Sequence, residues 1–202
     1  MRYVAYFAVL SLGGCIFAQA GSFSLGLGVA PQRVTFSAGG SGVSFSGFAF
    51  GLLGRYAFTD RIAAGADIIY STYRDKDEFN ILGSRYKKVT TFRSIKVPLQ
   101  FVYMLQPSNR FYVDLLGGLQ PEIDLGYTTR ITEDGETTTE SGSGDGFFFG
   151  ILLGAGGRFE VKDGLFLTGQ LRFDYGRRDG GLVTSNVTTL GLLVGGYYRF
   201  GK

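Results

Sequence analysis

The chain lacks histidine and tryptophan, has a single cysteine at position 15, and contains no apolar run long enough to cross a membrane as a helix. Without histidine it has no side chain whose ordinary pKa lies near neutrality, the property that general acid–base catalysis uses most. With so little histidine and cysteine it is also poorly equipped to bind transition metals. These absences predict a protein with no catalytic residues, no metal and no cofactor.

Charged residues are few, and their signs nearly balance. The chain has 20 lysines and arginines against 17 aspartates and glutamates. If Arg2 is removed with a leader, the formal charge becomes 19 − 17 = +2. A charge so close to neutral gives no reason to expect a nucleic-acid partner. The 33 glycines and 15% aromatic residues favour a sheet protein over a disordered one.

Residues 1–20, MRYVAYFAVLSLGGCIFAQA, have the composition of an export signal. They combine a basic start, a short apolar stretch and a small-residue cleavage site ending at Ala20. We therefore predict a signal peptide over 1–20 and one mature domain over 21–202. Cleavage after Ala20 leaves the mature chain without cysteine, which suits an oxidising periplasm. Lipoprotein processing at Cys15 is the alternative, because LGGC (12–15) resembles a lipoprotein cleavage site.

Hydrophobicity alternates with a period of two in eight segments. In LFLTGQLRFDY (165–175), for example, the odd positions are largely apolar and the even ones largely polar. Successive strand side chains point to opposite faces, so each such segment has one apolar and one polar surface. The predicted strands are 22–32, 43–58, 62–73, 92–105, 111–125, 146–160, 165–175 and 187–200.

The connections between these segments alternate between short and long. Short turns are predicted at 59–61, 106–110 and 161–164, and longer polar loops at about 33–42, 74–91, 126–145 and 176–186. Short turns at one end and long loops at the other are typical of outer-membrane barrels. The pattern predicts an all-β fold, an eight-stranded antiparallel transmembrane up-and-down β-barrel. Because the first connection is long, both termini are expected in the periplasm.

The parity of the strands separates charged from apolar positions. An Arg or Lys that faces the bilayer midplane costs about 2–4 kcal/mol, so the charged face must line the interior. It collects five cations and five anions, which must pair in a space that side chains just fill. We therefore predict a closed, salt-bridged interior, with a narrow polar pathway as the alternative. The ten residues are Arg55, Asp67, Lys96, Asp114, Glu122, Asp124, Arg158, Arg172, Asp174 and Arg199.

Two of the predicted loops carry opposite charge. The loop over 126–145 is acidic, whereas the loop over 74–91 is basic. One interpretation is that the basic loop contacts the anionic groups of lipopolysaccharide; the other is that the two loops attract each other and remain solvated. The basic residues are Arg74, Lys76, Arg85, Lys87 and Lys88.

Aromatic residues gather near the predicted strand ends. Amphipathic rings prefer the membrane interface, so these positions predict two aromatic girdles. The girdle at the edge next to the long loops would contain Tyr70, Tyr73, Phe92, Phe147 and Tyr175.

Three stretches resemble the small outer-membrane β-barrel proteins of the OmpA-membrane-domain and PorT-like type. They are GLLGRYAFTDRIAAGADIIYS (51–71), SIKVPLQFVYML (94–105) and the aromatic-ended GGYYRF (195–200). The signal ending FAQA also suggests a Bacteroidota source. The resemblance is to a membrane domain alone, so no peptidoglycan-binding domain is expected after Lys202. It implies a monomer that the barrel-assembly machinery inserts among outer-membrane lipid and lipopolysaccharide.

The function expected from these features is non-enzymatic. We expect a barrel that serves envelope integrity or surface interaction through its extracellular loops. One alternative is a narrow pore or a PorT-like component of a protein-secretion system. A second is a soluble periplasmic barrel that binds a ligand, which the ten inward charges oppose.

Overall fold

The computed structural model describes residues 21–38, 41–81, 84–133, 135–144, 146–179 and 184–201. The predicted signal peptide and Cys15 lie outside the described residues. Nearly all described residues belong to β-strands. Within these ranges, no helix has the length and apolarity needed to cross a membrane.

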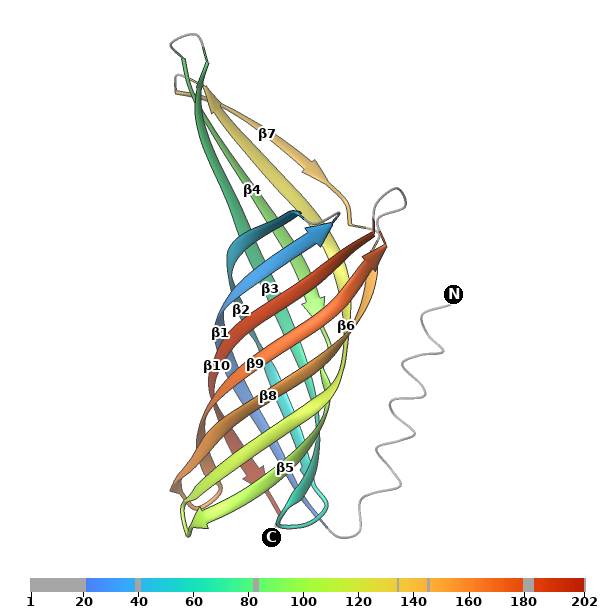
Figure 1. Ribbon diagram of the computed structural model, residues 1–202. Helices are drawn as coiled ribbons and strands as arrows, with labels where there is room; N and C mark the ends of the chain where they lie inside the picture. The colour runs from blue at the N-terminus through green and yellow to red at the C-terminus, as the bar shows by residue number, and fades with distance from the viewer. Residues whose placement is uncertain are drawn as a thin grey trace, which may run out of the picture.

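The described residues form ten strands, and every paired neighbour is antiparallel. Their order is β2-β1-β10-β9-β8-β6-β4-β3-β5, and pairing of β2 with β3 and of β5 with β6 closes the sheet. Figure 1 shows the resulting barrel. The strands are β1 (Ser22–Ala38), β2 (Ser41–Ala57), β3 (Ile62–Ile81), β4 (Ser84–Lys96), β5 (Leu99–Ser108), β6 (Phe111–Glu133), β7 (Glu136–Gly142), β8 (Phe147–Lys162), β9 (Leu165–Asp179) and β10 (Thr184–Phe200).

These ten strands occupy eight positions around the wall. β4 and β5 share one position, because both pair with β3 on one side and with β6 on the other. They are separated at Val97 and Pro98, where proline offers no N–H to the ladder. Among the described strands, β7 pairs with β6 alone. The prediction of an eight-stranded antiparallel barrel is therefore confirmed.

Apolar side chains face outward along the wall. Leu27, Phe147 and Leu167 are 67%, 66% and 56% exposed, whereas Phe166, on the other face of β9, is 2% exposed. The predicted aromatic girdle is wrong at two positions: Tyr73 is buried and Phe92 half-buried, and their rings stack with centroids 5.4 Å apart. Parity explains the error, because Tyr73 lies on the same face of β3 as the inward Asp67.

The two ends of the barrel differ. The turn end carries the short β2–β3, β5–β6 and β8–β9 connections, together with the start of β1 and the end of β10 (Figure 1). At the other end, the sheet end, β3, β4 and β6 continue well past their neighbours, and β7 lies beside β6 (Figure 1). We call residues 74–81, 84–93, 127–133 and 136–142 of these four strands the projecting sheet.

The prediction of long polar loops is wrong for most of their length. Most of 74–91 and 126–145 forms the projecting sheet, β1 and β2 extend to Ala38 and from Ser41, and β9 continues to Asp179. Polar side chains can stay in water while the backbone pairs, and threonine fits a pleated strand well. Cross-strand contacts support the sheet: Phe79 stacks on Tyr86 at 5.6 Å, and Thr90 hydrogen-bonds Thr129 at 3.1 Å.

A β-bulge marks the base of the projecting sheet. The register of β6 against β4 shifts between Arg93 and Ser94, where Leu125 is the extra residue. Gly126 follows with a φ of 104°, and its N–H donates to the Asp124 carboxylate at 2.8 Å. The inward Asp124 thus caps the bulge.

We expect Gly126→Ala to lower the free energy of unfolding by about 2–5 kcal/mol. The positive φ disfavours a side chain by about 1–2 kcal/mol, and crowding adds about 1–3 kcal/mol because a Cβ would lie 2.9 Å from the Gly144 nitrogen. Gly135→Ala is the control: its φ is 98°, and no described atom lies within 4 Å of its Cβ position. Chemical unfolding in lipid vesicles would measure the free energy of unfolding of both variants. An equal loss of stability in the two would contradict the crowding at Gly126.

Candidate functional site: the barrel interior

Strand alternation brings the ten predicted charges to the inner face of the wall. Asp114 and Asp67 are 0% and 1% exposed, and five more are buried almost as deeply: Arg55, Lys96, Asp124, Arg158 and Arg172. Glu122, Asp174 and Arg199 are only partly buried. Apart from Asp124, which caps the bulge, and Arg199 at the turn end, these residues form three layers of ion pairs along the interior.

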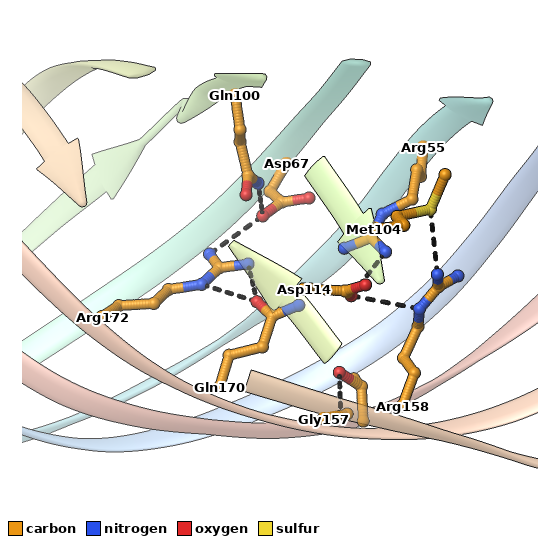
Figure 2. Close-up of polar contacts among 10 residues, drawn as sticks. Arg55, Asp67, Gln100, Met104, Asp114, Gly157, Arg158, Gln170 and Arg172 are labelled. Atoms are coloured by element: carbon orange, nitrogen blue, oxygen red, sulfur yellow. Dashed lines mark hydrogen bonds and ion pairs between the residues drawn. The ribbon is translucent and has the colours of Figure 1, made fainter. Parts of the chain in front are cut away.

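The layer nearest the turn end centres on Asp114 of β6. One carboxylate oxygen, Oδ2, lies 2.7 Å from Nη1 of Arg55 and 3.0 Å from Nε of Arg158 (Figure 2). The guanidinium groups also lie over aromatic rings, Arg55 over Tyr197 at 5.1 Å and Arg158 over Tyr112 at 5.0 Å. A single buried carboxylate therefore compensates two buried cations.

The middle layer joins strands on opposite sides of the barrel. Arg172 of β9 donates from Nη1 to Asp67 of β3 at 2.9 Å and from Nε and Nη2 to the Gln170 side-chain oxygen (Figure 2). Asp67 also accepts hydrogen bonds from the Gln100 side chain and from the Gly54 N–H. Four side chains from β3, β5 and β9 thus meet across the interior.

The third layer lies toward the sheet end. The Lys96 ammonium is 3.8 Å from Glu122 and 3.6 Å from Asp174, and it donates to Thr189 at 3.4 Å. These distances are longer than those of the other layers, and both carboxylate side chains are 14% exposed. Its ion pairs are therefore the least tight of the three layers.

Two features of the interior escaped sequence reasoning. Glu160 pairs with Arg199 at 3.3 Å at the turn end, and parity would have found it on the same face as Arg158. Apolar residues are also buried inside the barrel beside the charged layers, where a polar interior was predicted. They include Leu53, Val102, Leu116, Leu152, Phe166 and Leu193.

Open space inside the barrel is unequally divided. A cavity of about 500 Å³ opens at the turn end and is lined by Arg55, Arg158 and Phe166 among others. Beside Lys96, Glu122 and Asp174 the space is only about 30 Å³. Within the described ranges, no group of three or more Asp, Glu, Cys or His residues is placed to hold a metal ion.

The projecting sheet has two unlike faces. The face that continues the outward wall is basic. Among its described residues, Glu78 is acidic and five are basic: Arg74, Lys76, Lys87, Arg93 and Arg130. The face that continues the interior is acidic. Among its described residues, Lys88 is basic and five are acidic: Asp75, Asp77, Glu133, Glu136 and Glu140. Contacts agree with this division, since Lys87 lies 3.6 Å from Glu78 and Tyr86 donates to Glu133.

The predicted basic segment is therefore split between the faces. Arg74, Lys76 and Lys87 share the outward face, whereas Lys88 lies on the other, opposite Asp77. Arg85 lies in β4 and pairs with Asn80.

The sequence matches a known family over residues 17–179, described as "Outer membrane protein beta-barrel domain". No curated protein is significantly similar in sequence. Among solved structures, the attachment invasion locus protein Ail of Yersinia pestis is similar at 18% identity and a TM-score of 0.48, covering 90% of this chain and 100% of that one. Neisserial surface protein A is similar at 16% identity, with coverages of 89% and 99% and a TM-score of 0.48.

The outer membrane protease OmpT from Escherichia coli is also similar, at 10% identity and a TM-score of 0.45, with coverages of 90% and 97%.

Proposed function

The chain belongs to the outer membrane protein β-barrel domain family, and from that premise we propose that it is a closed, non-enzymatic barrel whose role lies at the surface it presents. The three ion-paired layers carry this proposal. Each buried charge in them has an opposite charge within 4 Å, so the interior is neutralised internally. The absence of histidine from the chain supports the non-enzymatic part.

The same proposal orients the barrel. Family members of this size place short turns in the periplasm and longer connections outside the cell. We infer that the turn end, with both ends of the mature chain, faces the periplasm and that the projecting sheet faces outward. The protein would then be a monomer that is exported by its signal peptide, inserted by the barrel-assembly machinery, and in contact with lipopolysaccharide.

Single-channel conductance in a planar bilayer tests the closed interior. Refolded mature protein is expected to give no steady openings, because side chains from β2, β3, β5, β6, β8 and β9 meet across the interior. A difference in gel mobility between unboiled and boiled samples would show that silent protein is folded. Reproducible openings would contradict the proposal.

A narrow pore or a PorT-like part of a secretion system is the second candidate. The cavity of about 500 Å³ at the turn end favours it, because it reaches the first charged layer from one side. Loss of exported proteins on deletion of the gene would support the secretion role. A soluble ligand-binding barrel is not proposed, because the outward wall is apolar along its strands.

A further inference from the structure

The outward wall contains an apolar hollow. It has a volume of about 630 Å³ and crosses β10, β1, β2, β3 and β4. Gly195, Gly28 and Gly51 stand side by side in neighbouring strands along its floor. Around them lie outward apolar side chains, namely Leu27, Val29, Phe50, Leu52, Tyr70 and Val194. In a wall surrounded by lipid, a hollow of this kind suits a hydrocarbon chain.

Cations follow directly along the same strands toward the sheet end. Arg33 lies four residues beyond Val29 on β1, and Arg74 lies four beyond Tyr70 on β3. Four residues of strand span about 13 Å. Both arginines pair with Ser46 of the intervening β2, so their backbones are about 10 Å apart. Both side chains are exposed.

Further basic residues lie on the same face as Arg33 and Arg74. Arg93 lies two residues along β4 from Ile95, which also lines the hollow, and Lys76, Lys87 and Arg130 continue the basic face of the projecting sheet. The opposite face is acidic. An anionic group is therefore attracted to the face above the hollow and repelled from the other.

We propose that the hollow and the arginines beyond it form a seat for one molecule of a phosphorylated, acylated outer-leaflet lipid, lipopolysaccharide. Its acyl chains lie in the hollow, and its phosphates contact Arg33, Arg74 and Arg93. The planar guanidinium fork matches phosphate oxygens in a bidentate manner. This inference rests on the proposed function, which places the sheet end outside the cell.

The test is titration of the folded mature barrel in detergent with bisphosphorylated lipid A, read by native mass spectrometry. We expect a one-to-one complex. Arg74→Glu should weaken it about fivefold or more, since each cation near an anionic lipid surface contributes roughly that factor. Lys88→Glu is the matched control, because it makes the same change of charge on the acidic face and should leave the affinity unchanged.

A second pair of variants tests the hollow itself. Val194→Trp fills it from the outward side and should abolish the one-to-one complex. Leu115→Trp adds the same ring to the outward face of β6, away from the hollow, and should not. Should Val194→Trp fail to fold, Val29→Phe fills the same space. Dephosphorylated lipid A should bind more weakly than the bisphosphorylated form.

Several outcomes would overturn the seat. An equal loss of lipid A affinity in Arg74→Glu and Lys88→Glu would show an effect of net charge alone. Full binding by Val194→Trp would show that the acyl chains lie elsewhere. Equal binding of phosphatidylglycerol would show that any anionic lipid suffices. If the barrel does not conduct and binds no lipid A, only the proposed lipid seat is overturned. If the barrel conducts ions, only the proposed closed interior is overturned.

Discussion

Replacing Asp114 with asparagine is expected to lower the free energy of unfolding by about 3–5 kcal/mol, the usual cost of removing one partner from a buried ion pair. The substitution keeps the size and shape of the side chain and removes only its charge. Arg55 and Arg158 both depend on that carboxylate, at 2.7 Å and 3.0 Å. Urea unfolding of the barrel in lipid vesicles, followed by circular dichroism, would measure the loss.

Glu160→Gln provides the control for this experiment. It removes the charge from an ion pair with Arg199, whose side chain is 39% exposed. Exposed pairs contribute about 0–1 kcal/mol, so this variant should be close to the wild type. If Asp114→Asn proved equally mild, water would have to reach the interior charges, and the closed interior would lose its main support.

The fold of the wall could be predicted because the membrane constrains both faces of every strand. Outward positions must be apolar and buried charges must face in, so parity alone places Asp67, Lys96 and Asp114 inside. The same rule would have placed Tyr73 and Glu160, had it been applied to every residue rather than to the charged and strand-end ones.

The projecting sheet could not be found by hydrophobic alternation, because both of its faces meet water. A different signal was present in the sequence: from Arg74 to Asp77 the sign of the charge alternates with a period of two. The threonines at 128–129 and 137–139 also favour strand. Long polar connections in this chain are therefore better judged by charge parity and β-propensity than by hydropathy.

The partners of the interior charges were also beyond sequence reasoning. Parity says which residues face inward, but it does not give the relative heights of strands that lie far apart in the chain. Arg172 meets Asp67 across 105 positions because the registers of the intervening strands add up around the barrel.

Arg172→Leu is expected to lower the free energy of unfolding by about 3–5 kcal/mol while leaving conductance absent. Leucine makes the position apolar and fills part of its space, but Asp67, 1% exposed, loses its ion partner at 2.9 Å. The layers around Asp114 and Lys96 remain in place on either side and keep the interior closed. Urea unfolding and bilayer recordings on the same protein would measure both quantities.

The double variant Asp67→Asn/Arg172→Leu separates a structural interior from a gated one. Asparagine keeps an acceptor for the Gly54 N–H, at 3.3 Å, and leaves no charge unpaired. Replacing both partners of a buried pair is often nearly neutral, so most of the lost stability should return with the barrel still silent. If Arg172→Leu instead proved as stable as the wild type and conducted ions, Arg172 would gate a pathway, and the interior charges would serve selectivity rather than closure.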